Sequence, residues 1–185
     1  LCDNIGGNGT GITFDLSTKN SDVTPNIPFS SYTFGYYPSE NDARNNINEI
    51  TTPISNTINP QPIFVRVEDT DSNCFGYTSF NLVVNPVPNV IAPSPLEVCD
   101  SDDSPDGYAV IYLTEKDDEI TGGDPNLNVT YHYNPTDAST GDSPIPVPYI
   151  NSAGPLDPPE VVYARVFNLQ TGCVNTTTLD VNITI

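Results

Sequence analysis

The sequence has little positive charge. Its 185 residues include 5 Lys plus Arg against 24 Asp plus Glu, which gives a formal net charge of −19 at pH 7. Binding to nucleic acid or insertion at an anionic membrane surface needs a basic patch, so we expect neither as a partner. The acidic balance fits a soluble surface protein in a medium rich in divalent cations, or simply an acidic surface kept for solubility.

The residue patterns of catalysis are also missing. Histidine occurs once, as His132 between Tyr131 and Tyr133, where strand alternation predicts that it faces solvent. No nucleophile elbow, phosphate loop or pair of metal-ligating histidines is present. Any chain with 24 acids contains some pair of carboxylates, so counting alone does not indicate a glycosidase. We therefore expect that the protein is not an enzyme.

Long hydrophobic runs and a sustained helical period are absent too. The 19 Pro and 12 Gly divide the sequence into short runs that alternate with period two, which is typical of an all-β sandwich. Helix is expected only as about one turn in each of Asn41–Asn45 and Glu115–Ile120. No signal peptide, transmembrane run or lipidation motif is visible, so we expect a piece of a longer secreted protein.

What the sequence does contain is a duplication. The run Ile63–Glu68 precedes Cys74 as Val162–Phe167 precedes Cys173, and the arginine lies eight residues before the cysteine in both copies (74 − 66 and 173 − 165). The cysteine lies six residues before the next alternating run in both copies (80 − 74 and 179 − 173). Matched spacings around a rare residue indicate an internal repeat.

The repeat predicts two tandem antiparallel β-sandwich domains of the immunoglobulin or fibronectin type. We expect the first domain at residues 1–87 and the second at 96–185. The segment 88–95 is rich in proline and should form a semi-rigid linker. Within each alternating run, every second residue is expected to face the core. The expected core residues are Ile12, Phe14, Leu16, Phe34, Tyr36, Phe80, Leu82 and Val84 in the first copy and Ala109, Ile111, Leu113, Val129, Tyr131, Leu179, Val181 and Ile183 in the second.

Each copy has one cysteine near its start and one late in its length. Four cysteines allow three pairings, and the autonomy of tandem domains favours Cys2 with Cys74 and Cys99 with Cys173. Such bonds would close loops of 72 residues (74 − 2) and 74 residues (173 − 99), each worth about 4 kcal/mol in the chain-entropy account. A zinc site is the rival interpretation, but there is no C-x-x-C and only one histidine. Disulfides imply an oxidising, extracellular compartment.

Two sets of charged residues are candidates for a specific role. The acidic loop at the start of the second copy could bind calcium through Asp100, Asp102, Asp103 and Asp106, or could be a solvated turn. The two repeated arginines are expected to cover the core with their stems while their guanidinium groups pair with carboxylates. The predicted structural ion pairs join Arg66 to Asp42 and Arg165 to Asp137.

The order of landmarks resembles that of a known family. Cys2-Asp3, Phe14-Asp15-Leu16, Asp42-Ala43, Phe64-Val65-Arg66-Val67 and Cys74 follow one another in the first copy. The second copy has Cys99-Asp100, Asp106-Gly107, Asp137-Ala138, Tyr163-Ala164-Arg165-Val166 and Thr171-Gly172-Cys173. This pattern resembles the tandem immunoglobulin-like repeats of large Bacteroidetes cell-surface adhesins that are secreted by the type IX system, including gliding-motility adhesins. The resemblance covers nearly the whole chain and specifies no ligand.

The resemblance implies a non-catalytic structural and adhesive module on the bacterial cell surface, which spaces and presents binding regions and is stiffened by calcium if the acidic loop binds it. Its partners would be neighbouring repeats of the same chain and an unknown surface, glycan or protein target. The alternative is a carbohydrate-binding or accessory domain pair of a secreted polysaccharide-degrading enzyme, in which aromatic residues stack on sugars. The candidate aromatic residues are Tyr37, Phe75, Tyr77 and Tyr149.

Overall fold

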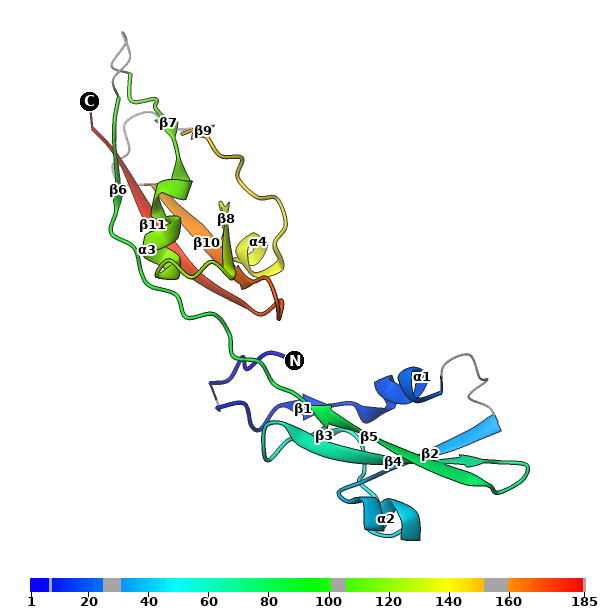
Figure 1. Cartoon of the computed structure of the whole chain (residues 1–185). Helices are drawn as coiled ribbons and strands as arrows, with labels where there is room; N and C mark the ends of the chain where they lie inside the picture. The colour runs from blue at the N-terminus through cyan, green and yellow to red at the C-terminus, as the bar shows by residue number, and fades with distance from the viewer. Residues whose placement is uncertain (7, 25–30, 101–105, 152–159, 185) are drawn as a thin grey trace. The chain divides into compact units, whose positions relative to one another are not determined.

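The protein forms two compact units, Leu1–Pro86 and Val87–Ile185. The structure, a computed structural model, describes residues 1–6, 8–24, 31–100, 106–151 and 160–184. Each unit is built mainly of short strands, as Figure 1 shows. The prediction of an all-β chain with antiparallel sheets in two tandem domains is confirmed.

The first unit has two antiparallel sheets. A two-stranded sheet pairs β1 with β3, and a three-stranded sheet has the order β2-β4-β5. In the larger sheet Phe34 lies opposite Val67, and Val65 lies opposite Thr78. The strands are β1 (Thr13–Phe14), β2 (Tyr32–Tyr37), β3 (Ile54–Ser55), β4 (Gln61–Asp69) and β5 (Phe75–Leu82).

The second unit repeats this arrangement and adds one strand at the edge of its larger sheet. Its order is β6-β11-β10-β8, and the added strand β6 runs parallel to β11. The smaller sheet pairs β7 with β9. The strands are β6 (Leu96–Cys99), β7 (Val110–Ile111), β8 (Leu127–His132), β9 (Tyr149–Ile150), β10 (Glu160–Asn168) and β11 (Val174–Thr184). At the place of β6 the first unit has a single bridge, between Cys2 and Asn85.

Short helices occur at equivalent places in both units. Helix α2 (Glu40–Asn45) packs against β2, β4 and β5, and α4 (Pro135–Thr140) packs against β8, β10 and β11. Each begins at a polar cap, since the side chains of Ser39 and Asn134 accept the N–H of the residue three positions later. The remaining short helices are η1 (Leu16–Lys19), α1 (Asn20–Val23), η3 (Leu113–Lys116) and α3 (Asp117–Thr121).

The core of each unit lies between its two sheets. Leu16, Ile111 and Leu113 are buried, as the period-two pattern predicted, while Ile12 and Phe14 are half-buried. The buried cluster of the second unit has twelve residues and that of the first has five among the described residues. The second unit therefore has the more complete core, and its Leu96 on β6 is part of it.

The second face of the larger sheet is covered as well, which alternation alone did not predict. We expected His132 to face solvent, but it is fully buried. Its Nδ1 donates to the carbonyl oxygen of Asp142 (2.7 Å), which leaves Nε2 to accept from the Thr130 hydroxyl (2.9 Å). Helix α4 packs on this part of the sheet and shields the residue that the simple inside–outside pattern placed in water.

The proline-rich segment 88–95 lies within the second unit. Asn175 donates its side-chain N–H to the carbonyl of Pro88 (3.0 Å), and the N–H of Ile91 donates to the carbonyl of Ile120 (3.0 Å). The unit boundary lies between residues 86 and 87. The segment that we predicted to be a spacer is therefore attached along one of the domains that it connects.

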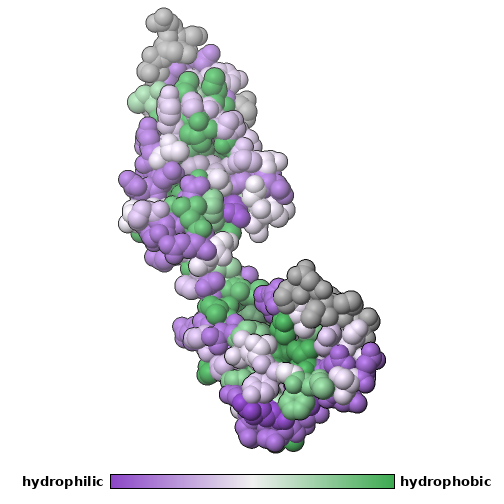
Figure 2. Space-filling model, turned by 45° about the vertical axis from the view of Figure 1, so that its right-hand side comes forward, coloured by the Kyte–Doolittle hydropathy of each residue, from purple (hydrophilic) through white to green (hydrophobic). Residues whose placement is uncertain are grey.

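The surface is mostly polar. In the face shown in Figure 2, hydrophilic residues cover much of both units, and hydrophobic residues are visible in patches. Within the described ranges no helix combines the length and hydrophobicity that crossing a bilayer requires.

Candidate functional site

One cysteine of each repeat lies in the turn between the two long strands of the larger sheet. Cys74 connects β4 to β5, and Cys173 connects β10 to β11. In each turn the cysteine carbonyl accepts a hydrogen bond from a backbone N–H five residues earlier, that of Asp69 (2.9 Å) or of Asn168 (2.9 Å). The two turns therefore share the same backbone hydrogen bond.

The side chain at the start of each turn fixes its shape. Oδ1 of Asp69 accepts the N–H groups of the residues two and three positions later (3.0 and 2.8 Å), and Oδ1 of Asn168 does the same (2.9 and 2.9 Å). The residue directly before each cysteine has positive φ, at 55° for Asn73 and 71° for Gly172. The two sequences therefore form the same type of turn, and each turn contains a cysteine at the same position.

The other cysteine of each repeat lies beside the end of the last strand. Cys2 pairs in parallel with Asn85, and Cys99 pairs in parallel with Thr184. In both repeats the residue after the cysteine donates its N–H to the carbonyl of that partner (2.8 and 2.9 Å). These two cysteines are therefore also equivalent in structure.

The two cysteines of one repeat lie at opposite ends of their domain. The turn cysteine precedes the last strand, and the partner of the other cysteine lies eleven residues further on (85 − 74 and 184 − 173). Eleven residues of extended chain span about 36 Å, whereas the Cα atoms of a disulfide lie within about 7 Å. Figure 1 shows this for the second unit, where the turn between β10 and β11 lies far from β6. A bond within one repeat is excluded by this distance.

The observed disulfide joins the two repeats. Cys2 and Cys173 are disulfide-bonded to each other, while Cys74 and Cys99 are free and exposed. Our predicted pairs, Cys2 with Cys74 and Cys99 with Cys173, are therefore corrected. The prediction assumed that each domain closes on itself, but a strand of this length keeps its two cysteines apart.

Contacts inside each unit explain why Cys2 and Cys173 can meet. Cys2 lies beside Asn85, close to where the chain leaves the first unit. Asn175, two residues after Cys173, is bonded to Pro88, where the chain has just entered the second unit. Positions 85 and 88 are three steps apart along the chain (88 − 85), at most about 11 Å. Both cysteines are thus anchored near the same short connection.

In each repeat a buried asparagine forms hydrogen bonds with the loop that precedes the first strand of the smaller sheet, β1 or β7. Our sequence analysis missed this residue. Asn151 is 1% exposed, accepts the N–H of Ala109 (2.8 Å) and donates to the carbonyl of Gly107 (2.8 Å). Asn56 does the same in the first repeat, where it bonds Ile12 (2.8 Å). A signal was present, because the two asparagines occupy equivalent positions, each directly after a short strand, β3 or β9.

The predicted calcium ligands are described only in part. Asp102 and Asp103 lie outside the described residues. Oδ2 of Asp100 accepts the N–H of Gly107 (2.7 Å), and Oδ1 of Asp106 accepts that of Tyr108 (3.1 Å). Among the residues that the structure describes, no three metal-binding side chains gather at one place. Calcium binding stays a prediction.

Arg66 is structural, but its predicted partner was wrong. Its guanidinium pairs with Glu68 (3.0 Å), donates to the carbonyl of Ala43 (3.4 Å) and lies 3.4 Å from the centre of the Phe75 ring. Asp42 instead accepts hydrogen bonds at the start of its own helix, which also lower its pKa. The arginine thus bridges the sheet and helix α2 without the expected carboxylate.

Arg165 also lacks the predicted partner. It lies against Gly141, where an added Cβ would come within 3.1 Å of its Nε, and its guanidinium lies 5.2 Å from the centre of the Phe167 ring. Asp137 accepts a hydrogen bond from Asn134 at the helix N-terminus (2.9 Å). Helix capping competes for both aspartates, so neither predicted ion pair occurs in the described part of the chain.

The aromatic residues considered for sugar binding are largely occupied. Tyr37 and Tyr149 are buried. Phe75 and Tyr77 are exposed, but Arg66 lies over the first ring, and the Arg44 guanidinium lies 4.2 Å from the centre of the second. One face of each exposed ring is therefore covered by an arginine.

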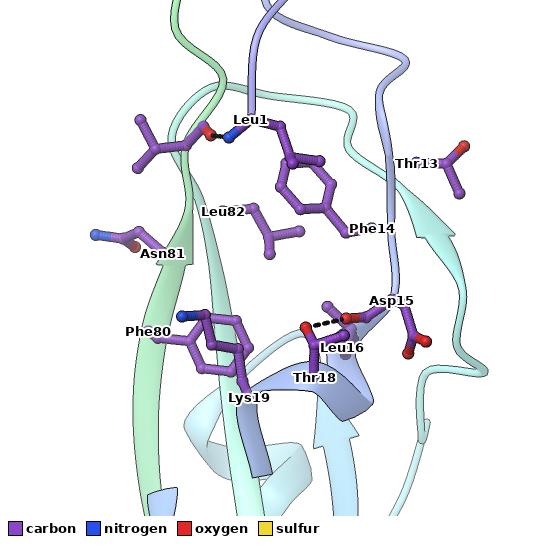
Figure 3. Close-up of a pocket in the computed structure, with 11 residues that line it drawn as sticks. Leu1, Thr13, Phe14, Asp15, Leu16, Thr18, Lys19, Phe80, Asn81 and Leu82 are labelled. Carbon is purple, nitrogen blue, oxygen red and sulfur yellow. Dashed lines mark hydrogen bonds between the residues drawn. The ribbon is translucent and has the colours of Figure 1, made fainter. Parts of the chain in front are cut away.

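The first unit contains a cavity of about 570 Å³ beside β5. In Figure 3 the side chains of Phe14 and Leu82 point toward each other across it, and Leu1 lies at one end. The terminal ammonium of Leu1 donates to the carbonyl of Val83 (3.1 Å). The cavity is lined by Leu1, Thr13, Phe14, Asp15, Leu16, Thr18, Lys19, Phe80, Asn81, Leu82 and Val83.

Comparison with protein families gives one match, which covers nearly all of the chain. The model of the Flavobacterium inter-domain disulphide bond domain matches residues 1–88 and again residues 95–185. A search of the curated proteins finds no match.

Solved structures with a similar arrangement are distant. An I-band fragment of titin aligns at 10% identity and a TM-score of 0.34, over 82% of this chain and 55% of that one. The immunoglobulin domains 1–4 of Sidekick-1 align at 10% identity and a TM-score of 0.30, over 85% of this chain and 41% of that one. The chain therefore spans about half of these structures or less.

Proposed function

Since the chain belongs to the family of the Flavobacterium inter-domain disulphide bond domain, in two successive copies, we propose that it is a structural segment whose neighbouring domains are locked together by disulfides. The observation that carries this is the separation of the two cysteines within each repeat. Because the two cysteines of a repeat lie at opposite ends of their domain, they are unable to bond to each other. Each is suited to bond to a cysteine of a neighbouring domain.

The bond between Cys2 and Cys173 would control how the segment carries tension. It joins positions 171 residues apart (173 − 2), and the closed loop includes every strand described in both units except β11, which follows Cys173. A force applied to the two ends of the chain then acts on the disulfide and on the hydrogen bonds of β11, and the other strands lie outside its path. Such a segment keeps its length under load, as a spacer at a cell surface needs to do.

We place this segment in a secreted cell-surface adhesin of the gliding-motility type, exported by the type IX system. Support comes from the repeat pattern, from the acidic surface with a formal net charge of −19, and from a disulfide, which persists in an oxidising exterior. In this proposal the segment is non-catalytic and extracellular. Its partners are further repeats of the same chain and a target bound elsewhere on the adhesin.

Single-molecule pulling between the two termini tests the mechanical role. The oxidised chain should lengthen only by the 12 residues beyond Cys173 (185 − 173), or about 40 Å at full extension. With reductant present the chain should also release the 170 residues between the cysteines (172 − 2). Release of the full length from the oxidised chain would contradict the proposal.

A glycan array tests the same proposal against sugar recognition. The spacer role predicts no selective binding by this chain, and the two exposed rings considered for sugar binding, Phe75 and Tyr77, are each covered on one face. Selective binding of one glycan, lost in a Tyr77→Ala variant, would identify a carbohydrate-binding domain pair instead.

A further inference from the structure

We infer that the first unit is built to receive a preceding copy of the same domain, with an incoming strand in the cavity beside β5 and a disulfide from Cys74 to the first cysteine of that copy. The inference rests on the proposed function, because it extends the disulfide-linked chain by one repeat. Two separate features of the first unit carry it.

The first feature is the place that β6 fills in the second unit. There Leu96 pairs with Val181 and Val98 pairs with Ile183 in a parallel ladder. Leu96 is 5% exposed and belongs to the core cluster that contains Ile111. The larger sheet of the second unit thus buries a leucine from the segment that leads into the domain.

The equivalent place in the first unit is the cavity. The first cysteines of the two repeats are 97 residues apart (99 − 2), and the repeated arginines are 99 apart (165 − 66). By these offsets Leu1 corresponds to Val98 and Leu82 to Val181. Phe14 and Leu16, which correspond to Ile111 and Leu113, line the cavity together with Leu82. The cavity therefore has the apolar walls that surround Leu96 in the second unit.

The backbone at the edge of β5 is set for a parallel strand. The ammonium of Leu1 already donates to the carbonyl of Val83 (3.1 Å), as the backbone N–H of a residue in a parallel strand would. A strand that continues backward from Leu1 would place the side chain two positions earlier opposite Leu82 and inside the cavity. An apolar side chain at that position, like that of Leu96, fits the lining.

The second feature is the state of Cys74. It occupies the same turn as Cys173, with the same backbone hydrogen bond from five residues earlier (2.9 Å in both). Cys173 is bonded to the first cysteine of the preceding repeat, whereas Cys74 is free and exposed. The turn of the first unit thus presents a thiol where the second unit has a disulfide.

Formation of this bond is a two-electron oxidation. The thiol of Cys74 and the thiol of the incoming cysteine each lose a proton, and their sulfur atoms form the new S–S bond. A disulfide oxidant such as oxidised glutathione accepts the two electrons and the two protons and leaves as two thiols. By the same logic Cys99, which corresponds to Cys2, awaits the turn cysteine of a following copy.

A short extension tests the cavity. The full chain is given five residues before Leu1, with the sequence Pro-Ser-Pro-Leu-Glu of positions 93–97. Filling the cavity should raise the melting temperature of the first unit by about 4–8 °C. Hydrogen exchange of peptides from β5, measured as a function of temperature, reports on this unit. A matched extension with aspartate in place of leucine should give no rise. Equal melting temperatures for the two extended chains would refute the strand site.

A full added repeat tests Cys74. Residues 1–97 are placed before the complete chain, and disulfides are mapped without reduction after oxidation with glutathione. We expect the added copy of Cys2 bonded to Cys74, beside the bond between Cys2 and Cys173 of the original chain. When Cys74 of the original chain is replaced in a Cys74→Ser variant, the added copy of Cys2 should react with iodoacetamide.

The two possible failures have different meanings. If Cys74 stays reactive while Cys2 and Cys173 remain bonded, the inferred docking of a preceding copy is wrong and the proposed function stands. If Cys2 and Cys173 are not bonded to each other either, the proposed function itself is overturned.

Discussion

At the scale of single residues, polar side chains hold the repeat in shape, and they were the hardest to predict. Asn151 and its equivalent Asn56 bond backbone groups far away in the sequence. The equivalent positions of the two asparagines could be read from the sequence, but their hydrogen-bond partners depend on the fold and could not. The same is true of Asp137, which accepts a hydrogen bond from the helix cap Asn134 and does not pair with Arg165.

Truncation of the buried asparagine should destabilise its unit. Asn151→Ala leaves the N–H of Ala109 and the carbonyl of Gly107 without their partner. Loss of two buried hydrogen bonds should cost about 1–3 kcal/mol, seen as a lower denaturant midpoint with an unchanged slope. The exposed residue Asn89 provides the control, and Asn89→Ala should change the midpoint little. Equal midpoints for the two variants would show that the hydrogen bonds of Asn151 contribute nothing to the stability of the unit.

A half-buried carboxylate should make the stability of the second unit depend on pH. Burial raises the pKa of Asp117 above its ordinary value of 3.8, although Tyr131 donates a hydrogen bond to it (2.6 Å). A raised folded-state pKa means that this contribution is present at low pH and is lost as the pH rises through the folded value.

The Asp117→Asn variant removes this titration and keeps an oxygen that can accept from Tyr131. As the pH rises above about 4, its stability should therefore fall less than that of the wild type. Melting curves across this range, compared at each pH, measure the difference. Parallel curves for the two chains would contradict a role for Asp117.

At the scale of elements, the alternating runs predicted the strands well and the coverage of the sheets poorly. The alternating run that begins at Leu179 lies inside β11, and the run Val162–Phe167 lies inside β10. Alternation tells which residues share a face, but it does not tell which element packs on that face. His132 was wrongly expected in water because the position of α4 on the sheet depends on tertiary contacts.

The acidic loop before β7 remains the candidate calcium element. If it binds calcium, millimolar calcium should raise the melting temperature of the second unit, because only the folded loop gathers the ligands. The double variant Asp102→Ala, Asp106→Ala should lose most of that response. Identical melting curves with calcium and with chelator would identify the loop as solvated surface.

At the scale of the whole molecule, the duplication was readable and the disulfide pairing was not. Repeat spacing alone predicted two domains, and the family match in two copies agrees with it. The pairing depends on which end of the last strand each cysteine occupies. The position of Cys74 before that strand was visible in the sequence, but the parallel pairing of Cys2 with Asn85 was not.

The central claim is that the disulfide joins the two domains, and peptide mapping of the unmodified chain tests it most directly. Free thiols are alkylated without reductant, and the digested protein is analysed by mass spectrometry. We predict a single linked peptide pair that contains Cys2 and Cys173, with alkyl groups on Cys74 and Cys99. Linked pairs of Cys2 with Cys74 and of Cys99 with Cys173, and no alkylated cysteine, would contradict the account.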